Sequence, residues 1–191
     1  MKLVLILVLM IVSVMAVVGT FLINSVSTFY LDSFYGQMQN VFNQSSAMES
    51  LQEAAAEQGA PGLQTVIAAR ESALGIDDYR NYYILDAEGR YLEGSNPNIT
   101  LTRTSNIVAA MAGEVGTRSA VSDSVMDIAV PIDKEGDGSV DYIVYITDDK
   151  SEISDLSWRF FQIVMQAMMF GLLAAILLSF LLSKTITNPI E

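Results

Sequence analysis

Two uncharged apolar stretches decide how this chain is organised: residues 3–23 read LVLILVLMIVSVMAVVGTFLI, and residues 160–183 read FFQIVMQAMMFGLLAAILLSFLLS. At about 1.5 Å of rise per residue, helices of these lengths span roughly 31–36 Å, against about 30 Å of hydrocarbon in a bilayer. We therefore predict membrane-spanning helices over residues 1–24 and 159–183. Membrane lipid is then a partner of both, and residues 25–158 form one polar segment between them.

The middle segment is strongly acidic. Residues 24–158 contain 21 Asp and Glu against seven Lys and Arg, a net charge of −14 in a chain whose total is −12. A field of this sign excludes nucleic acid as a partner and favours cations, although it also serves solubility. The absence of Cys and His excludes disulfides, thiolate and imidazole chemistry and a phosphoacceptor His within these residues, and leaves only oxygen ligands for a metal.

The few charges near the apolar stretches predict the orientation. Lys2 precedes the first and Lys184 follows the second, which favours cytoplasmic termini and an extracytoplasmic middle segment, residues 25–158, although Arg159 argues the other way. Apolar sequence continues well beyond the length of a secretory signal core, so we predict an uncleaved anchor. Gln162 and Gln166 share one face of the second stretch. They either hydrogen-bond across a helix interface or occupy an interfacial position that water reaches.

A long helix is predicted from the first span out to about residue 58, because only one glycine interrupts it. Its seam positions alternate in steps of three and four, a pattern that serves either a dimer or packing on the chain's own domain. The seam consists of Leu31, Phe34, Met38, Val41, Ser45, Met48, Gln52 and Ala55.

The rest of the middle segment predicts an α+β domain. After a break at residues 59–62, a short amphipathic helix is expected to end at Gly75, followed by strands over residues 79–85 and 90–92 with a turn between them. A helix over residues 104–111, strands over 125–132 and 140–147, and a last helix running into the second span complete the order. We expect an antiparallel sheet accompanied by a long N-terminal helix.

This order resembles the extracytoplasmic PAS-like or Cache sensor domain of bacterial receptors. The resemblance covers about residues 25–156, and it is carried by the YILDAEG turn at residues 83–89 and by Val-Pro-Ile at residues 130–132. In that family, ligands lie against the sheet. The residues that would line such a site here are Arg80, Tyr82, Arg103, Arg118 and Tyr145, although core aromatics and surface arginines explain them equally well.

The final residues, 184–191, read KTITNPIE and are similar to the opening of a HAMP linker, in which Pro starts the first cytoplasmic helix. Together with the layout, they look most like the WalK-like sensor histidine kinases of Gram-positive bacteria. That resemblance implies a homodimer in the cell membrane and a two-component system. Its further domains would carry the phosphoacceptor His, bind ATP and act on a cytoplasmic response regulator.

Acidic residues suggest a divalent cation as the one conceivable cofactor. Four carboxylates would lie near the outer membrane surface, although helix N-terminal charge and solubility explain most of them. They are Asp148, Asp149, Glu152 and Asp155. Residues 133–141 also echo a calcium loop but lack its final Glu. We interpret them as a polar hairpin loop.

No nucleophile–base pair or phosphate-binding loop is apparent, so we predict no catalytic residue in this chain. The sequence therefore predicts the sensing and signal-transducing part of a sensor histidine kinase, for which a small ligand, a cation or a cell-wall component would be the extracytoplasmic partner. The same input half would also suit a chemoreceptor or a cyclic-dinucleotide enzyme. A membrane-anchored domain that binds cell wall or a partner protein is the alternative from another class.

Overall fold

The computed structural model describes residues 2–97, 101–118, 123 and 125–187. These residues form an α+β protein with a four-stranded antiparallel sheet and two long apolar helices. The chain divides into two compact units, of which one contains Met1–Ser27 and Ile153–Glu191 and the other contains Thr28–Glu152. We call them the helical unit and the sheet unit. The predicted fold class is confirmed at this level.

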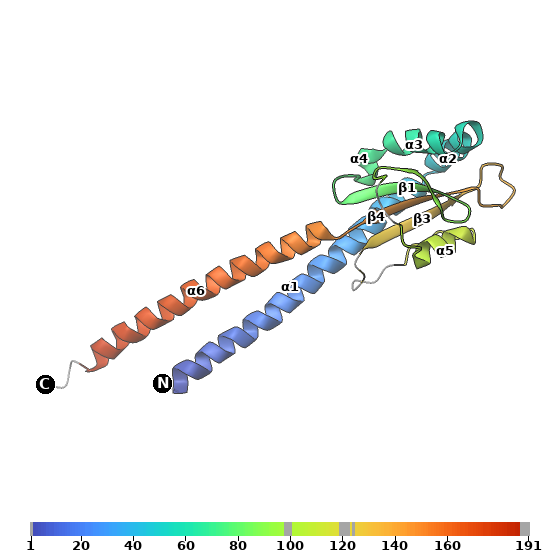
Figure 1. The fold of residues 1–191 in the computed structure, drawn as a ribbon. Coiled ribbons are helices and arrows are strands. Elements are labelled where there is room, and N and C mark those ends of the chain that lie inside the picture. Colours follow the sequence, from blue (N-terminus) through green and yellow to red (C-terminus); the bar gives the residue numbers. More distant parts are fainter. Residues whose placement is uncertain (1, 98–100, 119–122, 124, 188–191) are drawn as a thin grey trace. The chain divides into compact units, whose positions relative to one another are not determined.

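Two helices enter the helical unit. Helix α1 runs from Lys2–Phe42 and helix α6 from Ser151–Thr187, and Figure 1 shows both as long continuous helices. Both are long and apolar enough to cross a membrane, and the apolar parts of each are exposed. Helix α6 continues through Lys184 to Thr187. The Asn-Pro predicted to start the next helix lies outside the described residues.

The sheet unit is built on strands β1 (Arg80–Asp86), β2 (Tyr91–Gly94), β3 (Met126–Ile132) and β4 (Tyr142–Asp148). Their order is β2-β1-β4-β3, and every neighbouring pair is antiparallel. All four strands were predicted to within two residues at each end. The strands are the clearest secondary-structure signal in this sequence, because β-branched and aromatic residues gather in these stretches.

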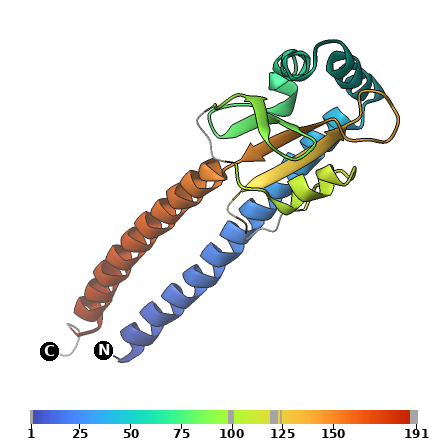
Figure 2. The same cartoon turned by 45° about the vertical axis from the view of Figure 1, so that its right-hand side comes forward.

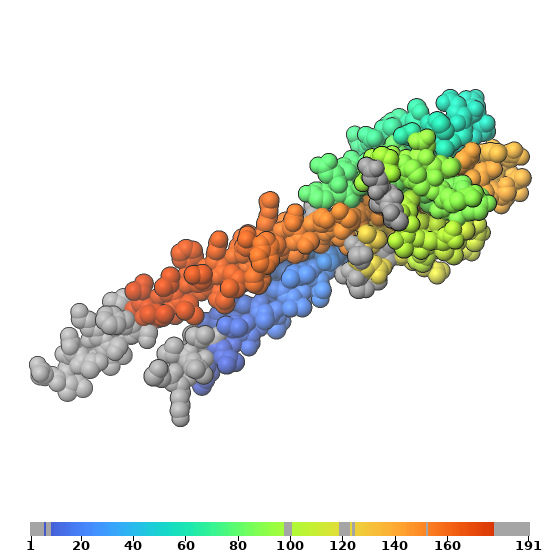
Figure 3. All heavy atoms as spheres, in the orientation of Figure 1, coloured from blue at the N-terminus to red at the C-terminus, as the bar shows by residue number. Residues whose placement is uncertain are grey.

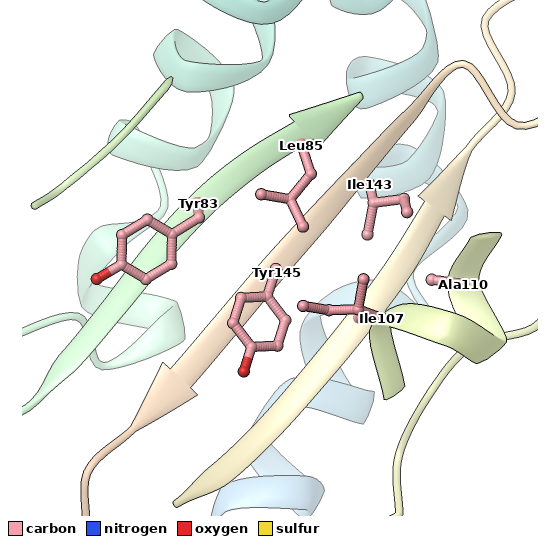
Figure 4. Close-up of a cluster of buried hydrophobic side chains, with 7 residues drawn as sticks. Tyr83, Leu85, Ile107, Ala110, Ile143 and Tyr145 are labelled. Atoms are coloured by element: carbon pink, nitrogen blue, oxygen red, sulfur yellow. The ribbon is translucent and has the colours of Figure 1, made fainter. Parts of the chain in front are cut away.

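Side chains of opposite parity divide the sheet into two faces. The register places Tyr83 and Ala129 opposite Tyr145, so odd-numbered residues of the three longer strands share one face. Helix α5 (Ser105–Met111) packs there through Ile107 and Ala110, as Figure 4 shows. We call this side the α5 face.

The even-numbered residues point to the opposite face, which we call the helical face. In Figures 1 and 2 the outer end of α1 and helices α2 (Ser45–Gln58), α3 (Ala60–Ala68) and α4 (Glu71–Leu74) lie on this side. The side chains that these helices bury include Phe34, Met38, Leu51, Leu63, Ile67 and Leu74. The core of the unit is therefore two layers of side chains, one on each face of the sheet.

The predicted single helix to residue 58 is wrong, because the chain turns between α1 and α2. Gln44 adopts an extended backbone (φ −75°, ψ 120°), and its side-chain Nε2 donates to the carbonyl of Asn40 at 2.8 Å. That bond satisfies a carbonyl near the end of α1. The turn lets Phe42 and Ala47 both face the core. A second difference follows at Gly59, which alone separates α2 from α3, so that Pro61 lies in the first turn of a helix.

The heptad seam packs within the chain's own domain. Phe34, Met38, Val41 and Ala55 are all buried in the sheet unit. Beyond the turn, the buried positions of α2 do not continue the helical repeat of those in α1, and the seam residue Ser45 is exposed. The apolar part of the seam is therefore occupied by the fold itself.

The outer edge of β3 is covered by a short bridge. Gly116 exchanges two backbone hydrogen bonds with Ala129, at 2.9 and 3.0 Å. A β-carbon on Gly116 would collide with the carbonyl oxygen of Asn106, so only glycine allows this approach.

Candidate functional site

Arg80, the first residue of β1, lies opposite Asp148, the last residue of β4. Both point to the helical face. The Arg80 Nε donates to Asp148 Oδ2 at 3.1 Å, and their side chains are only 13% and 9% exposed. An ion pair so far removed from water is held by geometry and by further hydrogen bonds, because desolvation opposes it.

The remaining groups of the guanidinium bind two helices. Nη1 donates to Gln37 Oε1 of α1 at 2.7 Å and to the carbonyl of Leu74, the last residue of α4, at 2.9 Å. The guanidinium carbon lies 5.0 Å from the ring centroid of Phe34, also in α1. We call Arg80 with these four partners the Arg80 clamp. It joins α1, α4, β1 and β4 at one point.

Gly75 makes room for the clamp. It ends α4 in the left-handed conformation (φ 65°), and a β-carbon there would lie 2.6 Å from Arg80 Nη1. Gln37 also donates through Nε2 to the carbonyl of Ala73, at 2.9 Å. The end of α4 is thus held against α1 by both side chains of the Gln37–Arg80 pair.

Asp148 also holds the chain where α6 begins. Its Oδ1 accepts the N–H of Lys150 at 3.0 Å, and Asp149 Oδ1 accepts the N–H of Ser151 at 2.9 Å. Lys150 takes a left-handed backbone (φ 57°), which is unusual for a residue with a β-carbon. Its Nζ donates to the carbonyl of Asp123 at 2.6 Å, while burial lowers the pKa of its ammonium group. One carboxylate therefore contacts both the residue that binds α1 and the turn that starts α6.

A second polar cluster lies on the α5 face around Asp127 of β3, a residue only 4% exposed. Thr104 Oγ1 donates to Asp127 Oδ2 and Asn106 Nδ2 to Oδ1, each at 2.7 Å. Thr104 also caps α5, because its hydroxyl accepts the N–H of Ile107 at 3.3 Å. The hydroxyl of Tyr35 in α1 donates to the carbonyl of Asp127 at 3.0 Å. Helices α1 and α5 are thereby both bonded to the same residue of β3.

Two tyrosines stand beside this Asp127 cluster. Burial raises the pKa of Tyr145 far above its usual value, and the charge of Asp127 raises it further. The ring of Tyr83 stacks on that of Tyr145 with centroids 6.3 Å apart, and burial raises the pKa of Tyr83 as well. The Tyr83 hydroxyl is fully buried and has no hydrogen-bond partner within the described part of the chain. Figure 4 shows both rings on one side of the sheet.

The five residues predicted to line a ligand site do not come together. Arg80 and Tyr82 belong to the helical face and Tyr145 to the α5 face, because strand parity separates them. Arg103 donates through Nη2 to the carbonyl of Glu88 at 2.8 Å. Arg118 is exposed, and its backbone N–H donates to Asn106 Oδ1 at 2.8 Å. Gln37, Asp127 and Asn106 were not predicted from the sequence, although strand parity would have separated the two faces.

The predicted cation site gains no support from the carboxylates whose contacts are described. Asp148 is paired with Arg80, and Asp149 bonds the first turn of α6. Among the described residues, no three acidic side chains gather as a metal site requires. For Glu152 and Asp155 the site stays a prediction.

The calcium-like loop is the polar hairpin loop that we expected. It joins β3 to β4 and lies on the surface in the space-filling view, in orange (Figure 3). The Asp133 carboxylate accepts backbone N–H groups from residues 135–138, with the shortest bonds, 2.6 Å, from Gly136 and Gly138. The Gly138 bond contributes most to lowering the Asp133 pKa. Backbone amides thus fill the coordination positions that a cation would need.

A scan against protein-family models and a search of curated proteins find no match for this chain.

Proposed function

We propose that this chain is the sensing and signal-transducing part of a membrane receptor, of the sensor histidine kinase type that resembles WalK-like proteins. In this proposal the sheet unit is a PAS-like or Cache domain outside the membrane. The N-terminal end of α1 and the C-terminal end of α6 then lie in the cytoplasm. Residues after 184 would begin a HAMP linker.

The observation that carries the proposal is the Arg80 clamp. Helix α1 enters the sheet unit as a continuous helix, and α6 leaves it two residues after Asp149. Arg80 bonds α1 through Gln37 and bonds Asp148 on the other side, and Asp148 fixes the turn before α6. A change in the domain that moves α1 against β4 is therefore transferred to the start of α6. A domain that only binds cell wall or anchors a partner has no need of such a linkage.

Two arrangements of the clamp would suffice for signalling. A stimulus shifts their populations only by the difference in its affinity for the two states. An interface of packed helices and buried polar contacts favours discrete states over gradual deformation. A small polar ligand on the α5 face would find hydrogen-bonding groups in the Asp127 cluster and in the Tyr83 hydroxyl, which has no partner among the described residues.

The first experiment reads the coding sequence beyond Glu191. A phosphoacceptor His segment followed by an ATP-binding domain supports the kinase, whereas a long methylatable coiled coil supports a chemoreceptor. A stop codon directly after Glu191 removes signalling through cytoplasmic domains and favours the anchored binding domain.

Topology is tested separately, and the absence of Cys makes this simple. Single Cys variants at Ser46 and Glu57, which are both exposed in the sheet unit, should react in intact cells with a maleimide that does not cross membranes. Lys184→Cys should react only after the cells are opened. The reverse pattern would overturn the proposed orientation.

A further inference from the structure

One face of α6 carries polar side chains at the spacing of a helix–helix seam. From the outer end inward, positions alternate in steps of four and three. The seam consists of Asp155, Arg159, Gln162, Gln166, Met169, Leu173 and Ile176. Such spacing keeps the side chains on one stripe of a helix that packs along another helix. Its outer four members are charged or amides, and its inner members are apolar.

This seam faces away from the other helix of the unit. Within the helical unit, α1 and α6 line a shared apolar groove of about 370 Å³. The α6 residues that line it are Ser157, Phe160, Phe161, Val164, Met165 and Met168. At about 100° per residue, Gln166 lies roughly 170° from the centre of that lining and Gln162 roughly 130°. Both glutamines are exposed, as are the apolar seam residues Met169, Leu173 and Ile176.

The glutamines lie at a depth where an amide needs a partner. Trp158 marks the outer end of the apolar stretch, and Gln166 follows eight residues later, about 12 Å further along the helix axis. In hydrocarbon, an exposed primary amide has no water to bond, so it gains most by hydrogen-bonding another helix. The described groove with α1 does not offer that contact, because neither glutamine lines it.

We infer that this polar seam is the surface through which two copies of the chain associate, with α6 packed against α6 of the second copy. The inference rests on the membrane location that we have proposed. Copies inserted in the same direction are related by a two-fold axis along the membrane normal, so their helices run parallel. Each glutamine then meets its own counterpart, and an amide is complementary to itself because it both donates and accepts.

The charges of the seam fit the same arrangement. In a parallel pair, Arg159 packs into a space lined by residues of the adjacent layers of the other helix, which include its Asp155. Two arginines and two aspartates then meet near the membrane surface with no net charge. A lipid tail can neither hydrogen-bond the amides nor pair with these charges. A second copy of the chain is therefore the occupant that the surface specifies.

The test uses the full chain, which contains no Cys, in lipid vesicles at a low protein-to-lipid ratio. Met169→Cys places a thiol in the seam, and Met168→Cys, its matched control, places one in the groove lining. Under mild oxidation we expect disulfide-linked dimers from Met169→Cys and far fewer from Met168→Cys. Equal yields from the two variants, or none from Met169→Cys, would overturn the seam.

A second comparison addresses the amides while retaining the reporter thiol. Adding Gln162→Leu and Gln166→Leu to Met169→Cys should lower the dimer association constant by roughly tenfold, whereas Ile163→Leu should leave it unchanged. An unchanged constant with both leucines would show that the amides do not direct association. Extraction of the chain from the vesicles by alkaline carbonate would overturn the membrane location itself, and with it the seam. Retention without cross-linking would overturn the seam alone.

Discussion

Replacing Arg80 by Met removes the charge of the clamp but keeps an apolar side chain of similar length. Asp148 would remain, 9% exposed, with its carboxylate deprived of its cation. Removing one partner of a buried pair costs about 3–5 kcal/mol, and we expect the lower end because the pair is not fully enclosed. A loss of about 3 kcal/mol should lower the Tm of a unit of this size by roughly 10 °C.

The measurement is thermal unfolding of the full chain in detergent, followed by near-ultraviolet circular dichroism. Buried tyrosines of the sheet unit, such as Tyr82, Tyr83 and Tyr145, contribute to that signal. The double variant Arg80→Met with Asp148→Leu should recover most of the loss, because no charge is then left buried. Arg90→Met is the matched control, since Arg90 is 70% exposed in its own ion pairs and should leave the Tm close to that of the wild type. Unfolding of Arg80→Met within about 2 °C of the wild type, or a double variant no more stable than the single one, would show that the ion pair does not hold the unit together.

Three further changes test other parts of the sheet unit. Tyr83→Phe should raise stability by about 1 kcal/mol, because it removes a buried hydroxyl for which the described residues offer no partner. Asp133→Asn should lower the Tm at neutral pH. The difference should shrink as pH falls below about 4 and disappear only below the folded-state pKa of Asp133, because that pKa is depressed and the contribution is lost when the folded carboxylate takes up a proton. Gly62→Ala should destabilise by about 1–3 kcal/mol, since its β-carbon would meet the carbonyl oxygen of Ala54 at a separation that no packed structure allows.

Two of these changes have a matched control on the same scale. Tyr145→Phe removes a hydroxyl that hydrogen-bonds within the Asp127 cluster, so it should destabilise where Tyr83→Phe stabilises. Gly36→Ala adds a methyl group with nothing within 4 Å in the interior of α1, and it should raise stability by about 0.5–1 kcal/mol. Loss of stability in Tyr83→Phe would mean that a water or a ligand bonds the hydroxyl. A difference for Asp133→Asn that does not change between neutral and strongly acidic pH would contradict the depressed pKa.

Most of the secondary structure could be predicted, because it depends on residues that are close to one another in the sequence. The alternation in Tyr83–Leu85 and the turn at Gly89 are visible in a few adjacent residues. The break between α1 and α2 was not visible, since Asn43 and Gln44 are ordinary helix residues. That break depends on a core that both Phe42 and Ala47 reach, which only the whole fold defines.

The site was harder to predict than the fold. Arg80 was chosen by residue type, and Asp148 was assigned to a different site, because the two are 68 positions apart in the sequence. Their pairing follows from the register of β1 against β4, which no local signal specifies. The role of Gln37 was not predicted, because an amide on a helix has the pattern of a surface residue unless the arginine beside it is known.

The bridge at Gly116 has a consequence for how the sheet unit meets other copies of the chain. The backbone groups of β3 that point away from β4 belong to odd-numbered residues, since Ala129 uses both of its own on Gly116. The carbonyl of Asp127 accepts Tyr35 and Asn106, and Pro131 has no N–H to offer. An edge occupied in this way leaves few backbone groups with which a strand from another molecule could pair. The β3 side of the sheet unit is therefore protected against edge-to-edge association with other copies of the chain.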